Sequence, residues 1–138
     1  MDLSSINYLA VIAAALGAFI FGVLWYSTPF FGKIWQKELG FSDEYLKQGN
    51  MGLIFGSSFV LMFLMSFGLA LIFNLIGYEN LCWLKGLLWG LLFGALFSGT
   101  SVGINYLYQR RSFRLWAIDA FYQIIMAGIM GIVLASWN

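Results

Sequence analysis

Residues 6–27 read INYLAVIAAALGAFIFGVLWYS and contain no charged side chain. An α-helix rises about 1.5 Å per residue, so a helix of this length crosses the roughly 30 Å hydrocarbon core of a bilayer. Three further long apolar stretches follow at residues 51–76, 83–107 and 115–137. Strands of a membrane barrel would be about ten residues long and alternate in character, and these stretches do neither. The sequence therefore predicts an all-α integral membrane four-helix bundle, in a single transmembrane domain over residues 1–138.

The composition of the 138-residue chain is typical of a membrane protein. Hydrophobic residues make up 62% of it and charged residues 9%, and its mean hydropathy is +0.86. A soluble domain has about a quarter of its residues charged. The net charge of +1 gives no general attraction to nucleic acid, so we expect no nucleic-acid partner. Histidine is absent and Cys82 is the single cysteine, which excludes a His/Cys zinc cluster within one chain, and we expect neither a metal nor another cofactor.

The basic residues cluster in two of the three connections between the apolar stretches. Three lysines lie in the first connection and three arginines in the third, whereas the opposite side has only Lys85 and the terminal amine. The clustered residues are Lys33, Lys37, Lys47, Arg110, Arg111 and Arg114. Because basic connections tend to stay in the cytoplasm, we expect both of these connections to be cytoplasmic and both termini to face outward.

Residues 25–35, WYSTPFFGKIW, are predicted to mark the cytoplasmic end of the first span. The amphipathic rings of Trp25 and Tyr26 suit the headgroup layer, and Pro29 discourages continuation of the helix. Apolar and charged residues then recur at helical spacing, which predicts that residues 28–50 form a helical collar lying in the interface plane. The predicted interface motif consists of Trp25, Tyr26, Pro29, Gly32, Lys33 and Trp35.

Small residues recur every four positions in the first and third spans. The two sets are Ala10, Ala14, Ala18 and Gly22, and Gly86, Gly90 and Gly94. Each set forms a smooth stripe on one helix face, which lets a neighbouring backbone approach closely within the lipid bilayer. The stripes are expected to pack either inside one bundle or between subunits. The second alternative predicts self-association, and another membrane protein is the further candidate partner.

Polar residues inside the apolar spans are the candidates for a functional site, because they are costly in lipid. One group lies on the third span and one on the fourth, at similar depth, and together they predict a polar pocket of Ser98, Ser101, Asn105, Asp119, Tyr122 and Gln123. Asp119 has two interpretations. It either pairs with Arg114 or Arg111 and anchors the third connection, or it forms a proton or cation site.

The start of the chain carries a recurring pattern. An asparagine precedes the first span, and a glycine, a Trp-Tyr pair and a Phe-Gly-Lys-x-Trp sequence follow. These positions are Asn7, Gly22, Trp25, Tyr26, Phe31, Gly32, Lys33 and Trp35. This opening resembles a family of small bacterial and archaeal membrane proteins catalogued as domain of unknown function 1761. The resemblance implies a small four-span protein of the prokaryotic cell membrane and implies no activity.

Three classes of function remain from the sequence. The first is a structural or partner-binding membrane component that packs through its small-residue stripes. The second is a homo-oligomeric small transporter or channel with a polar path near Asp119. The third is an enzyme acting on a lipid, which the lack of histidine and the scarcity of carboxylates disfavour, so we expect no catalytic residues. Transport predicts that Asp119, Asn105 and Gln123 line water, whereas the structural interpretation predicts that they are satisfied by one another.

Overall fold

The computed structural model describes residues 3–137, and in this range it contains helices and no strand. Four helices are long and apolar enough to cross a membrane. They are α1 (Tyr8–Trp25), α4 (Met51–Ile76), the continuous helix Trp83–Tyr108 and α7 (Phe113–Ser136). The third of these consists of α5 (Trp83–Phe93), η3 (Gly94–Gly99) and α6 (Thr100–Tyr108). The prediction of an all-helical chain is confirmed for these residues, and so is the presence of four helices long and apolar enough to span a membrane.

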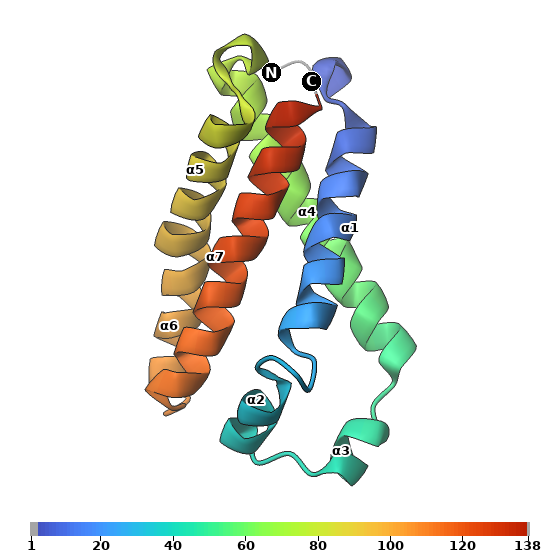
Figure 1. Cartoon of the computed structure of the whole chain (residues 1–138), viewed down its shortest axis with the longest axis vertical. Helices are drawn as coiled ribbons and strands as arrows, with labels where there is room; N and C mark the ends of the chain where they lie inside the picture. Colours follow the sequence, from blue (N-terminus) through green and yellow to red (C-terminus); the bar gives the residue numbers. More distant parts are fainter. Residues whose placement is uncertain (1–2, 138) are drawn as a thin grey trace.

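The other three long helices pack around α7. In Figure 1, α7 lies between α1 on one side and α5 and α6 on the other, and α4 crosses behind them. Helix α4 packs mainly against α1 and makes little contact with α5. Of the apolar window of α7, 56% is buried, against 28% or less in the other three helices. The last helix in the chain is therefore the centre of the fold.

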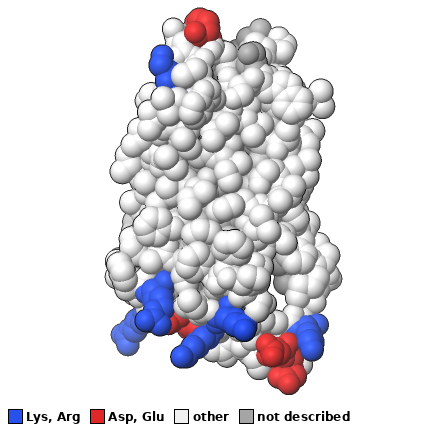
Figure 2. Space-filling view, viewed as in Figure 1, with Lys and Arg blue, Asp and Glu red and all other residues white. Residues whose placement is uncertain are grey.

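The two ends of the molecule differ in charge. The described parts next to both termini lie at one end with η2 (Tyr78–Asn80), whereas α2, α3 and the connection between α6 and α7 lie at the other (Figure 1). Figure 2 shows a broad uncharged band between these ends, with most of the charged side chains at the end that holds α2 and α3. An uncharged band flanked by charged ends is what a membrane-spanning chain requires.

Side-chain caps begin three of the four spanning helices. The side-chain oxygens of Asn7, Asn50 and Ser112 accept hydrogen bonds from backbone N–H groups three residues later, each at 3.1 Å. These bonds satisfy N–H groups that the first turn leaves without a helical partner. Asn7 also donates from Nδ2 to the carbonyl oxygen of Trp137 at 2.8 Å. The asparagine ahead of the first span thus starts α1 and ties it to the end of α7.

Both small-residue stripes are used inside the chain. A Cβ added to Gly86 or Gly90 would collide with the backbone of α7, and one added to Gly94 would lie 2.6 Å from the Cα of Ile124. On α1, Ala10, Ala14 and Ala18 are fully buried in the core, and a Cβ on Gly22 would lie 2.7 Å from the hydroxyl of Tyr122. The stripes therefore make the contacts that were expected within one bundle.

The third span contains a π-helical segment that the sequence did not reveal. Over Gly94–Gly99 the helix widens to π geometry, which adds a residue to the turn and disturbs the regular pairing of carbonyl groups. Two side chains donate hydrogen bonds to backbone carbonyl oxygens of this segment. Trp116 donates from Nε1 to Gly99 at 3.0 Å, and the hydroxyl of Thr100 donates to Leu96 at 2.7 Å. The expected single regular helix over 83–107 is therefore two α-helical halves offset by this segment.

The predicted collar region contains two short helices, α2 (Gly32–Leu39) and α3 (Asp43–Lys47). The chain turns back tightly after α1, with the N–H of Phe31 donating to the carbonyl of Trp25 and that of Gly32 to Ser27, both at 3.0 Å. A Cβ on Gly32 would collide with the backbone of Tyr26 and Ser27, so only glycine fits this turn. Pro29 lies exposed within it.

Candidate functional site

Asp119 is a buried carboxylate held by two tyrosines. It lies on α7 about 9 Å from the start of that helix and is 8% exposed. Its Oδ1 accepts a hydrogen bond from the hydroxyl of Tyr26, and its Oδ2 accepts one from the hydroxyl of Tyr106, both at 2.5 Å. Hydroxyl-to-carboxylate bonds of this length are charge-assisted and strong. We call Tyr26, Tyr106 and Asp119 the Asp119 clamp, since they join the end of α1, α6 and α7.

Aromatic side chains surround the clamp. The ring of Tyr122 lies edge-on to that of Tyr26, with centroids 5.1 Å apart, and stacks on Phe21 at 5.9 Å. Trp25 donates from Nε1 to the carbonyl of Ile118 at 3.2 Å and packs against Phe31. Trp25 and Tyr26 were expected to face the headgroup layer. In the structure their polar atoms bond to α7, so this pair fastens α1 to the central helix.

The interpretation that Asp119 pairs with Arg114 or Arg111 is wrong. Arg114 pairs with Glu38 at 3.6 Å, and both carboxylate oxygens of Asp119 bind tyrosine hydroxyls. The reason is helical geometry, because a separation of five residues places Arg114 about 140° around α7 from Asp119. The guanidinium therefore points to the end of the molecule while the carboxylate points inward.

The predicted polar pocket is brought together only in part. Asp119 and Tyr122 lie side by side in the core, and Gln123 is half-buried. Ser101 and Asn105 are exposed on the third span and are absent from the hydrogen bonds of Asp119, while Ser98 lines a groove against α4. The neighbour of Asn105, Tyr106, occupies the expected place. The extra residue of η3 turns the face of α6 by about 100° relative to regular spacing, which explains the exchange.

Tyr106, Glu38 and Ser112 are site residues that sequence reasoning missed. One signal for Tyr106 was available. The third and fourth spans form a helical hairpin that turns near residues 109–112, and counting outward from the turn places Tyr106 opposite Leu115, about one helical turn from Asp119. No such counting finds Glu38, because its contact depends on how the collar folds back beneath α7.

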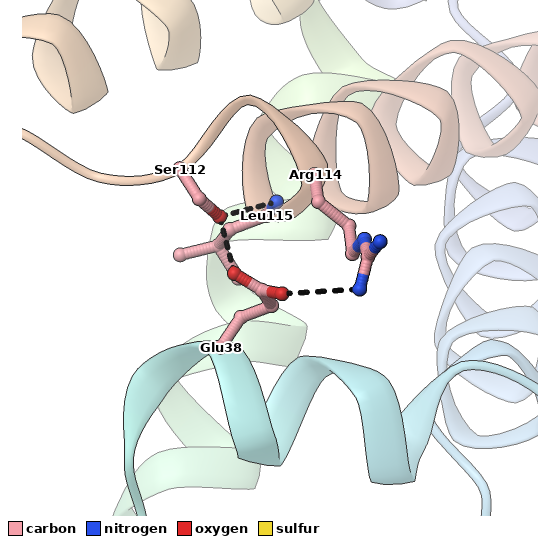
Figure 3. A network of polar contacts seen from close by, with 4 residues as sticks. All are labelled: Glu38, Ser112, Arg114 and Leu115. Carbon is pink, nitrogen blue, oxygen red and sulfur yellow. Dashed lines mark hydrogen bonds and ion pairs between the residues drawn. The ribbon is translucent and has the colours of Figure 1, made fainter.

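Glu38 fastens α2 to the start of α7. One oxygen of its carboxylate accepts a hydrogen bond from Ser112 Oγ at 2.5 Å, and the other faces Arg114 (Figure 3). Ser112 Oγ in turn accepts from the N–H of Leu115, which caps α7. The negative charge of Glu38 at this position also interacts favourably with the positive N-terminal end of the α7 dipole. Trp35 extends the attachment, with its ring edge-on to Tyr26 at 5.6 Å.

Replacing Ser112 with alanine should lower the free energy of unfolding by about 1 kcal/mol, because the hydroxyl both caps α7 and binds Glu38. Replacing Arg114 with alanine should cost about 0.5 kcal/mol or less, since the arginine side chain is 70% exposed and the ion pair is screened by solvent. The unfolding of each purified variant in detergent measures both effects. Equal losses would mean that the ion pair matters as much as the cap.

The Asp119 clamp has the chemistry of a structural joint. An ionised carboxylate only accepts hydrogen bonds, and each of its two oxygens has a tyrosine donor. Within residues 3–137, no group of three or more histidine, cysteine or acidic side chains is placed to hold a metal ion. The arrangement can hold three helices together through one buried charge.

The comparisons with known proteins identify a family. No curated protein and no solved structure matches the chain. A family model described as "Protein of unknown function (DUF1761)" matches residues 9–135, which confirms the resemblance found in the opening residues. The chain belongs to this family, and it is a small membrane protein with four candidate spanning helices.

Proposed function

We propose that the protein is a non-enzymatic structural component of the cell membrane that works by binding a partner, and that its first partner is a second copy of the chain. The observation that carries this is the Asp119 clamp. The carboxylate of Asp119, the most costly polar group within the spans, joins helices, and both of its oxygens accept hydrogen bonds from tyrosines. A transport path would instead need this carboxylate to face water.

The groove between α4 and the third span also favours a structural role over transport. It is lined almost wholly by apolar side chains, and Asp119, Asn105 and Gln123 do not line it. A polar substrate crossing the bilayer would need a succession of polar groups along its way.

Helix α4 offers the surface for self-association. The small residues of α1 and α5 are already covered within the chain. By contrast, residues 51–57 are exposed throughout, and a Cβ added to Gly56 meets nothing within 4 Å. Gly52 and Gly56 are four residues apart, the spacing that lets two membrane helices approach closely. A second copy would therefore pack against the first half of α4.

We place the collar in the cytoplasm and both termini outside. The support for this orientation is the clustering of lysines and arginines at the collar end of the molecule (Figure 2). Tied to α7 through Glu38, and packed through Trp35 against Tyr26, the collar would lie in the membrane interface as a fixed platform.

The oligomeric state in lipid nanodiscs, measured by native mass spectrometry, tests the proposal. We expect the wild type to be a defined oligomer and Gly56→Leu to shift it to monomer by at least tenfold in dissociation constant, because leucine keeps the two helices apart. Gly68→Leu is the matched control, since its position on α4 is equally open but lies further along the helix.

A monomeric wild type, or an oligomer that Gly56→Leu leaves intact, would contradict self-association through α4. Flux measurements on the same protein in sealed vesicles separate the transport alternative. Proton or cation flux above that of empty vesicles, lost in Asp119→Asn, would replace the structural proposal with a carrier.

A further inference from the structure

A groove opens sideways from the bundle between α4 and the third span. Its accessible volume is about 180 Å³. One wall is α4, the other is the end of α5 with the π-helical segment, and the floor is α7. Representative lining residues are Gly68, Leu69, Phe97, Ser98, Ala127 and Met130. The groove exists because α4 packs on α1 and makes little contact with α5.

The chemistry of the lining requires an apolar occupant. Ser98 is the single polar side chain among the residues that line the groove. A stable water needs two to four polar partners, so the groove does not hold water well. An empty space of this size would forfeit the dispersion contacts of all its lining atoms. Whatever fills the groove is therefore hydrocarbon-like.

The size of the groove favours a flexible chain over a helix. A helix with its side chains is about 10 to 12 Å wide, which a volume of 180 Å³ cannot admit. The volume admits several groups the size of a water molecule or a methylene. Part of a lipid acyl chain fits these dimensions.

A row of side chains leads from the groove to the nearer end of the molecule. Phe97, Phe93 and Trp89 are four residues apart on one helix face, with ring centroids 5.3 and 6.2 Å apart. Lys85 is the next member of the row, and it lies near η2, at the end of the molecule that holds the termini. From Lys85 to Phe97 is about 18 Å along the helix, comparable to the roughly 15 Å depth of one leaflet.

Lys85 can bind a phosphate. Its ammonium donates one hydrogen bond, to the carbonyl of Asn80 at 2.7 Å, and the residue is exposed. An ammonium group has three donors, so two remain for another acceptor. At the boundary of the bilayer, the phosphate oxygens of lipid headgroups can serve as this acceptor.

We propose that the groove and this row of side chains form a binding site for one anionic phospholipid, with the headgroup phosphate at Lys85 and an acyl chain running over Trp89, Phe93 and Phe97 into the groove. The lipid belongs to the leaflet on the side of the termini. It supplies the contacts that α4 and α5 do not make with each other. This site is independent of the proposed self-association, which uses the other half of α4.

Native mass spectrometry with dioleoyl phosphatidylglycerol as the probe tests the site. The wild type should retain one tightly bound lipid per chain, and Gly68→Leu should weaken its retention at least tenfold by filling the groove. Nothing lies within 4 Å of a Cβ at Gly68, so the variant should fold. Gly56→Leu, an equally open position outside the groove, should retain the lipid as the wild type does. Lys85→Ala should bind dioleoyl phosphatidylglycerol no more tightly than the wild type binds the zwitterionic dioleoyl phosphatidylcholine.

Three results would overturn the proposal. Unchanged retention in Gly68→Leu would show that the lipid does not enter the groove. If Lys85→Ala lost the lipid and Gly68→Leu kept it, the protein would contact the headgroup but would have no site for the acyl chain. A change of oligomeric state in Gly68→Leu, with the state of Gly56→Leu unchanged, would show that the groove holds a second copy of the chain.

Discussion

Replacing Gly90 with alanine should lower the free energy of unfolding by roughly 3 kcal/mol or more, although it adds a single methyl group. The new Cβ would collide with the carbonyl oxygen of Ala127 and lie 2.9 Å from the Cα of Gly128. Both obstacles are backbone atoms of α7, which cannot move aside as a flexible side chain can, so the two helices must separate. Thermal or denaturant unfolding of the purified protein in detergent measures the loss.

Gly56→Ala is the control for this prediction. Position 56 is also a helical glycine, but a Cβ there meets nothing within 4 Å. Alanine favours a helix over glycine by up to about 1 kcal/mol, so this variant should be as stable as the wild type or slightly more stable. If Gly90→Ala behaved in the same way, α5 and α7 would not pack as closely as described.

Replacing Asp119 with asparagine should lower the free energy of unfolding by roughly 2 to 4 kcal/mol. Hydrogen bonds to a charged group contribute about 1.5 to 3 kcal/mol each, and the neutral amide retains one oxygen acceptor where two tyrosine hydroxyls need partners. Because the carboxylate is buried, solvent cannot replace the lost hydrogen bond.

A double-mutant cycle identifies the source of the loss. We expect Tyr26→Phe and Tyr106→Phe each to destabilise the chain, and each to lose most of its effect when Asp119 is already asparagine. Tyr45→Phe removes a hydroxyl from an exposed tyrosine of α3 and should change little. Strictly additive effects of Tyr26→Phe and Asp119→Asn would mean that the two side chains do not interact.

The spans were predictable because each depends on a local property. Four long apolar stretches can be identified as spans without knowing what they pack against, and small residues at four-residue spacing indicate close helix contacts. The glycines of α5 did so, against α7. The asparagine noted ahead of the first span, Asn7, caps α1.

The site was only partly predictable, because it depends on the rotation of α6 about its axis and on the turn that follows α1. Asp119 was identified, but its partners were not. The π-helical segment at Gly94–Gly99 turns Tyr106 toward α7 in place of Asn105, and nothing in the hydropathy pattern reports an added residue in a helix. Tyr26 reaches Asp119 from just beyond α1, where the chain starts the turn that Gly32 permits.

The central place of α7 has a consequence for biosynthesis. A ribosome makes α1, α4 and α5 before it makes the helix on which α1 and α5 pack. Until α7 enters the membrane, the glycines of α5 face lipid, and Tyr26 and Tyr106 have no carboxylate to bind. Helices α1 and α4 can pack against each other before then, but the third span must wait in the bilayer without its main partner. The native packing forms in a late step, once α7 has been inserted and can receive its neighbours.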